Sequence, residues 1–122
     1  MDAQKIIERA VDDRYREELI GLSRKIWELA EVGYEETRSA ETLCEALEHH
    51  GFAVTRHLVD IPTAFKGVWG KGRPVVGILG EYDALPGLSQ EAGCPVKKPE
   101  HEGCPGHGCG HNNLGGGAVG AA

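Results

Sequence analysis

Three side chains that can bind a metal lie close together near the end of the chain, His107, Cys109 and His111, with a glycine after each of the first two. Glycine lets the backbone turn tightly, so that several side chains can approach one ion. Neutral imidazole and thiolate suit zinc and its neighbours better than calcium or magnesium, and they do not exclude manganese or cobalt. The segment 106–113 is therefore predicted to be a metal-binding loop. The alternative is a flexible glycine loop whose histidines bind nothing.

Two acidic residues upstream, Glu81 and Asp83, follow the apolar run 74–80. A continuous apolar run is typical of a strand buried on both faces, and the sites of open α/β sheets lie beyond the carboxyl ends of such strands. Because alternate residues of an extended segment point the same way, both carboxylates can face one spot while Tyr82 packs elsewhere. The pattern predicts that they share a site with the metal loop. A solvated acidic loop is the alternative.

Hydrophobic periodicity places these residues on helices and strands. Apolar residues recur every three or four positions from Tyr15 to Leu29, which predicts a helix with one buried face. The expected elements are helices over about 3–30 and 37–50, strands over about 52–59, 63–69 and 74–80, and the start of a helix within 113–122. The predicted fold class is α/β, a layered α/β sandwich with 74–80 as a central strand.

The composition excludes several function classes. The formal net charge of −6 argues against nucleic acid as a partner, because phosphate binding needs a basic patch. The chain has neither the apolar core of a signal peptide nor an apolar run that approaches a membrane span, so the expected location is the cytoplasm. There, free thiols or metal ligands are the expected state of the four cysteines. The apolar, uncapped run 115–122 predicts a cut through a longer domain.

Two long motifs carry a resemblance to a known family. The strings GEYDALPGLSQ at 80–90 and GHGCGHNNLGGG at 106–117 resemble the M20 family of metal-dependent amidohydrolases and peptidases, and most of all its aminobenzoyl-glutamate utilization protein B group. The string EVGYEE at 31–36 is also similar to the N-terminal pattern of the family. The resemblance implies the N-terminal part of an M20-like zinc-peptidase catalytic domain over 1–122, without the lid and dimerisation domain.

The resemblance also implies roles for individual residues. Cys109 and His111 match two metal ligands that related amidohydrolases take from a Cys-Gly-His segment. Asp83 matches an acidic residue at the strand end that serves the catalytic centre, either by orienting a ligand or by binding directly. Glu81 stands where many members have a histidine ligand, which leaves its role open.

Two further residues, His107 and Asn112, are possible neighbours of the implied site. The family does not clearly use the equivalent of His107 as a ligand, although this residue can hydrogen-bond in the site. Asn112 stands where several relatives carry Asp, which removes a charge near the metal. The implied cofactor is a divalent metal, Zn or Mn, with two ions in a full-length enzyme and no other cofactor.

The function implied by the resemblance is hydrolysis of an amide or peptide bond. A bound metal lowers the pKa of water from about 15.7 to about 7, which makes hydroxide available for attack on a carbonyl. Relatives take the general base and further ligands from downstream residues, so this chain alone is expected to be inactive. The implied substrate is p-aminobenzoyl-glutamate or a dipeptide, and full-length relatives are dimers.

A structural zinc site is the rival interpretation. Cys94, Cys104 and Cys109, with a histidine such as His101, His107 or His111, could close a four-coordinate shell in the glycine- and proline-rich loop. That site would hold its metal tightly and would not need Asp83. A phosphate-binding loop from Gly115 onward is a weaker rival, because the sequence lacks the spacing of the known phosphate-binding motifs.

Overall fold

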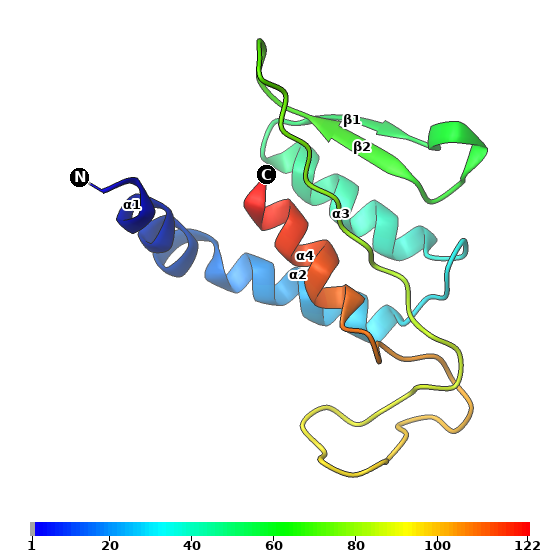
Figure 1. Cartoon of the computed structure of the whole chain (residues 1–122). Coiled ribbons are helices and arrows are strands. Elements are labelled where there is room, and N and C mark those ends of the chain that lie inside the picture. The colour runs from blue at the N-terminus through cyan, green and yellow to red at the C-terminus, as the bar shows by residue number, and fades with distance from the viewer. Residues whose placement is uncertain (1) are drawn as a thin grey trace.

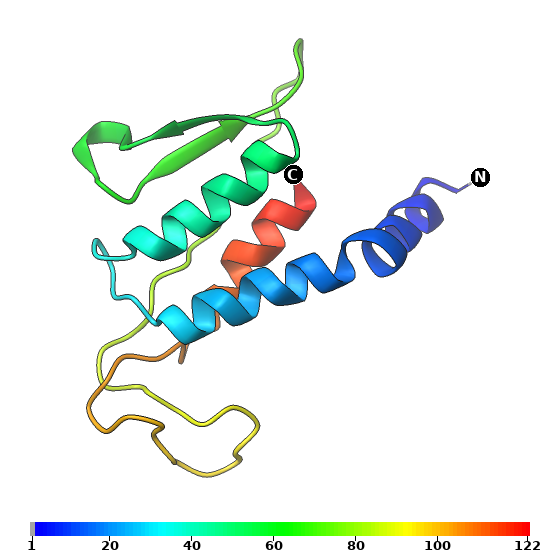
Figure 2. The same ribbon diagram turned by 180° about the vertical axis from the view of Figure 1, so that it is seen from behind.

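The computed structural model describes residues 2–122 as helices packed together beneath one β-hairpin (Figure 1). In chain order the elements are α1 (Ala3–Ala10), a π-helical turn (Val11–Tyr15), α2 (Arg16–Leu29), α3 (Thr37–His49), β1 (Ala53–Arg56), a 3-10 turn (Leu58–Asp60), β2 (Phe65–Val68) and α4 (His111–Ala121). Figure 2 shows α4 beside both α2 and α3, with the hairpin across α3. Helices packed on a small sheet confirm an α/β fold in this coarse sense.

The region expected to be one helix over 3–30 is helical from α1 to the end of α2, with the π-helical turn between them. Helix α2 ends because Ala30 adopts a left-handed conformation, with φ of 43°, and its N–H returns to the carbonyl of Ile26. The next residue, Glu31, binds the start of α3. The Glu31 carboxylate accepts hydrogen bonds from the backbone N–H and hydroxyl of Ser39, both at 2.8 Å, which caps the start of α3.

Helix α3 supplies much of the core and carries the hairpin. Its residues Leu43, Cys44 and Leu47 are buried, and burial raises the pKa of the Cys44 thiol to about 11. Strands β1 and β2 pair antiparallel, with Ala53 opposite Val68. Arg56 of β1 ties the hairpin to α3 through ion pairs to the carboxylates of Glu41, at 2.9 Å, and Glu48, at 2.6 Å.

The prediction of a central strand over 74–80 is wrong for the described chain. The segment is extended, but within residues 2–122 no backbone–backbone hydrogen bond involves residues 70–82. Its apolar side chains are exposed, with Val76 80% and Leu79 92% accessible. The physical reason is that a buried strand needs neighbouring strands for its backbone groups, and the sheet of the described chain contains only β1 and β2. The layered sandwich with this strand at its centre is therefore not formed.

Helix α4 begins at His111, two residues before the expected start, and packs through glycines. A Cβ atom added to Gly115 would lie 2.9 Å from Cβ of Tyr82, and one added to Gly116 would lie 3.5 Å from the backbone nitrogen of Ser23. Helix α4 runs antiparallel to α2, since Gly120 faces Leu19 while Gly116 faces Ser23. Close packing along both sides of α4 fixes where its first turn lies.

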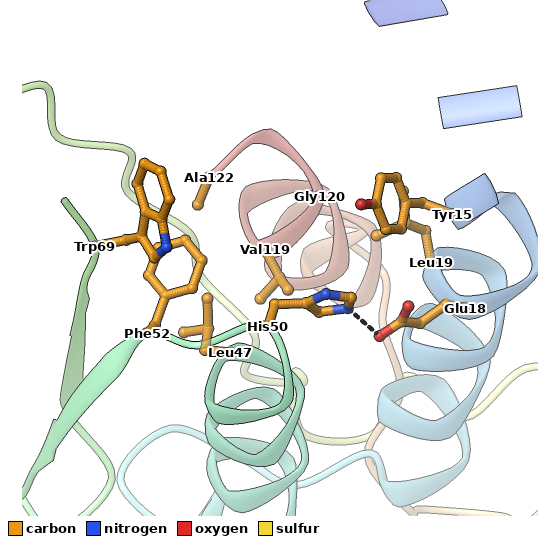
Figure 3. Close-up of a pocket in the computed structure, with 10 residues that line it drawn as sticks. All are labelled: Tyr15, Glu18, Leu19, Leu47, His50, Phe52, Trp69, Val119, Gly120 and Ala122. Carbon is orange, nitrogen blue, oxygen red and sulfur yellow. Dashed lines mark hydrogen bonds and ion pairs between the residues drawn. The ribbon is translucent and has the colours of Figure 1, made fainter. Parts of the chain in front are cut away.

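A cavity of about 350 Å³ opens at the opposite end of α4, between the ends of α3 and α4 and the start of α2 (Figure 3). A hydrogen bond between His50 and Glu18, at 2.8 Å, lies on the wall of this cavity. The cavity is separate from the first turn of α4, because none of the residues that the sequence assigns to the metal site lines the cavity.

Two alanine substitutions in α4 are predicted to act in opposite directions. Gly115→Ala forces a methyl group against Tyr82, and we expect it to lower the free energy of unfolding by about 1–3 kcal/mol. A methyl group at Gly117 would meet no atom of the described residues within 4 Å beyond its own helix, so Gly117→Ala should raise that free energy by about 0.5–1 kcal/mol through helix propensity. Urea unfolding followed by circular dichroism measures both. Equal effects of the two substitutions would contradict the packing of α4.

The exposed segment 74–80 is predicted to cause self-association, because it combines unpaired backbone with apolar side chains. A Val76→Lys/Leu79→Lys variant should be more monomeric than the wild type in sedimentation velocity at the same concentration. Thr55→Lys, an exposed site on β1, adds charge elsewhere and is the control. If the control dissociates the protein as well as the double variant does, general charge repulsion explains the effect and the segment does not.

Candidate functional site

His111, the first residue of α4, lies between two carboxylates. Its Nδ1 is 2.8 Å from Oδ1 of Asp83, and its Nε2 is 2.9 Å from Oε2 of Glu81. The His111 side chain is 18% exposed, whereas that of Glu81 is 60% exposed. The structure thus brings together three of the residues that the sequence assigns to the site.

The segment 81–84 is held so that its side chains alternate. The N–H of Ala84 donates to the carbonyl of Glu31 at 2.7 Å, which fixes one end of the segment against the residues after α2. The hydroxyl of Tyr82 donates to the carbonyl of Thr63, on the side away from His111, and burial raises the pKa of that phenol. With Tyr82 anchored there, Glu81 and Asp83 face the imidazole, as alternation requires.

The charge balance at His111 is incomplete without a further positive charge. A neutral imidazole carries one N–H, so it can donate to only one of the two carboxylates. If Nδ1–H donates to Asp83, the lone pair of Nε2 faces the oxygen of Glu81 at 2.9 Å. Both contacts are attractive only when a second proton is shared between the ring and the carboxylates, or when a metal cation takes the place of that proton. The donor set therefore fits a cation on the Nε2 side of His111.

This pair of donors is only part of a metal site. Cys109, predicted as the second ligand, lies exposed in the loop before α4. Throughout residues 2–122, no three His, Cys, Asp or Glu side chains are placed so that they could hold one ion. This holds equally for the rival zinc site, because Cys94 and Cys104 form no such group with Cys109 and a histidine.

Besides Glu81, the other two possible neighbours of the site, His107 and Asn112, turn inward toward α2. Both are buried, with 5% of each residue accessible. His107 Nε2 is 2.9 Å from the carbonyl oxygen of Ile26, and its ring is tilted over Trp27 with centroids 6.2 Å apart. Burial lowers the pKa of His107. Because a carbonyl oxygen can only accept, Nε2 carries the hydrogen of this bond.

Ser23 of α2 is a contributor that the sequence interpretation missed. Its hydroxyl donates to Oδ1 of Asn113 at 2.7 Å and accepts from Nδ2 of Asn112 at 2.9 Å. The signal was present in the sequence, because Ser23 stands four residues after Leu19 and three before Ile26, on the apolar face of the helix. A serine on such a face is expected to have a polar partner.

Comparison with known proteins supports the family that the motifs indicate. No family model matches the chain. The chain is 48% identical over 119 residues to a subunit of the p-aminobenzoyl-glutamate hydrolase of Escherichia coli (strain K12), a match that covers 95% of the chain. It is 35% identical to Xaa-Arg dipeptidase of Homo sapiens over 90% of the chain, and 34% identical to that of Mus musculus over 84%.

The chain spans about a quarter of the length of these relatives, since the matches cover 25%, 24% and 22% of them. No helix of the described residues has the length and apolar character needed to cross a bilayer. The match to the Escherichia coli subunit covers 95% of the chain, and so extends over both the Glu81–Asp83 segment and the loop before α4. The resemblance is therefore confirmed in this form: both kinds of relative are M20 family peptidases, and this chain is homologous to the part of them that it matches.

Proposed function

We propose that this chain is the part of a metal-dependent amidohydrolase that supplies half of the metal site. The observation that carries the proposal is the position of His111 between Asp83 and Glu81, where a second proton or a metal cation is needed for both contacts to be attractive. The reaction is hydrolysis of an amide or peptide bond. The leading substrate is p-aminobenzoyl-glutamate, because the relative with 48% identity is named for it. Dipeptides are the alternative, supported by the similarity to the Xaa-Arg dipeptidases.

Each residue has a distinct task in this proposal. Asp83 accepts the Nδ1–H of His111, which fixes the tautomer and leaves the lone pair of Nε2 free to bind a metal. Glu81 offers a carboxylate oxygen on the same side of the ring. Cys109, two residues before His111, supplies a thiolate, a ligand that Zn²⁺ accepts readily. The remaining ligands and the general base belong to residues outside this set.

A bound divalent metal would supply a nucleophilic hydroxide at neutral pH and would polarise the carbonyl of the substrate. The residues of this chain would hold the ion and determine the net charge of the site. Glu81, Asp83 and the thiolate of Cys109 carry three negative charges, which would more than balance the two positive charges of a divalent ion at this position. Because the described residues include no complete ligand set, we expect the 122-residue chain alone to hydrolyse neither p-aminobenzoyl-glutamate nor dipeptides.

One prediction of the proposed function concerns metal affinity. We expect the chain to bind Zn²⁺ or Mn²⁺ weakly, and Cys109→Ser, His111→Ala and Asp83→Asn each to weaken binding by about 10-fold or more. Asp83→Asn should act because an amide nitrogen beside Nδ1 would favour the wrong tautomer of His111. Isothermal titration calorimetry measures the affinities. Cys104→Ser is the control, since the proposal gives Cys104 no role; tight binding that collapses in this control would favour the structural zinc site instead.

Another prediction of the proposed function concerns activity and is tested with a chimera. Residues 1–122 replace the matching quarter of the Escherichia coli hydrolase chain to which they are 48% identical. The chimera should hydrolyse p-aminobenzoyl-glutamate, and His111→Ala in the chimera should lower kcat/KM by about 100-fold or more, which is roughly 2.7 kcal/mol of transition-state stabilisation. Released p-aminobenzoate is measured. An active chimera in which His111→Ala changes nothing would contradict the proposed site.

A further inference from the structure

The loop that carries Cys109 and His111 is bordered by His107 and Asn112, which are buried although residues 108–111 between them are exposed or half-buried. Among the described residues, no hydrogen bond joins either side chain to Asp83 or Glu81. Their side chains instead contact α2, from opposite ends of the short segment that holds the two proposed ligands. Buried polar side chains beside a functional loop are a costly arrangement, because burial removes them from water and each must find a partner.

The contacts with α2 lie one helical turn apart. His107 donates its Nε2–H to the carbonyl of Ile26 at 2.9 Å. Asn112 donates its Nδ2–H to the hydroxyl of Ser23 at 2.9 Å, with a longer contact of 3.4 Å to the Ser23 carbonyl. Ser23 and Ile26 are three residues apart, so they share one face of α2. The loop is thus attached to a single rigid surface at two points.

Both side chains keep a buried atom without a partner in the described chain, Nδ1 of His107 and Oδ1 of Asn112. An unpaired buried acceptor destabilises the fold, and an apolar side chain of similar size would avoid that cost. These polar groups nevertheless make hydrogen bonds to α2 that an apolar side chain could not make. What they provide is a fixed direction, since a hydrogen bond to a carbonyl holds an imidazole in one orientation whereas apolar packing does not.

The start of the loop is equally constrained. Leu85 and Gly106 exchange two backbone hydrogen bonds of 3.0 Å, and a Cβ on Gly106 would lie 2.0 Å from the carbonyl oxygen of Leu88. The backbone at 106 is therefore pressed against the segment at 88 and cannot shift toward it. From that point the contact of His107 with α2 determines where the following residues lie.

We propose that His107 and Asn112 are positioning residues, which fix the loop to α2 so that Cys109 and His111 approach the same ion. Neither binds the metal itself. The inference rests on the proposed function, because it assigns these two residues to the metal site described there. According to this inference, the site requires the hydrogen bond from His107 Nε2 to the carbonyl of Ile26. The imidazole ring itself is not required.

The test uses the whole chain and Co²⁺, whose absorption reports a bound thiolate directly. His107→Gln places an amide N–H near the position of Nε2, whereas His107→Asn places it near Nδ1 and His107→Phe supplies none. We expect Co²⁺ affinity to fall by about 10–100-fold in His107→Phe and His107→Asn, and to stay within about threefold of the wild type in His107→Gln. Asn112→Ala should resemble His107→Phe.

Thermal unfolding without metal is measured in parallel and separates positioning from folding. If His107→Gln keeps the Co²⁺ affinity of the wild type and His107→Asn loses it, affinity depends on the hydrogen bond. That result supports the inference even where all the variants lose stability. If the wild type shows the thiolate band but all folded variants bind Co²⁺ with equal affinity, the positioning role is overturned and the proposed metal site is not. If Cys109→Ser leaves the Co²⁺ spectrum and affinity of the wild type unchanged, the proposed metal site is wrong, and the positioning role is overturned with it.

Discussion

The close approach of α4 to its neighbours is the constraint on which the rest of the structure depends. Glycines at 115 and 116 let the helix lie against Tyr82 on one side and against Ser23 of α2 on the other. At these distances even a methyl group at Gly115 would force the segments apart. Since His111 begins the same helix, this packing also sets its place next to Asp83. The small residues of α4 are therefore part of the candidate site, although they carry no chemistry.

The sequence predicted those elements whose cause is local. The helical stretches at 3–30 and 37–50 follow from apolar residues repeating every three or four positions, a pattern that each segment contains by itself. The segment 74–80 shows the limit of such reasoning. Its composition suits a buried strand, but a strand exists only where other strands satisfy its backbone, and composition does not specify those partners.

The site was predictable to a similar degree. Alternation along 81–83 correctly puts Glu81 and Asp83 on one side, because it depends only on an extended backbone. In the loop, the closely spaced glycines remove any periodicity, so the sequence could not tell which side chains turn inward. His107 contacts Ile26 and Trp27 of α2, whereas Cys109 is exposed. The contacts of His107 involve residues that are distant in the sequence, so the local pattern does not specify them.

The central claim is that His111, oriented by Asp83, shares an ion with Cys109. X-ray absorption at the zinc edge of the chain loaded with one equivalent of Zn²⁺ tests it most directly. The account predicts a single sulfur neighbour at about 2.3 Å together with nitrogen or oxygen neighbours at about 2.0–2.1 Å, including an imidazole. Two or three sulfur neighbours, or a shell of oxygen alone with no imidazole, would contradict it.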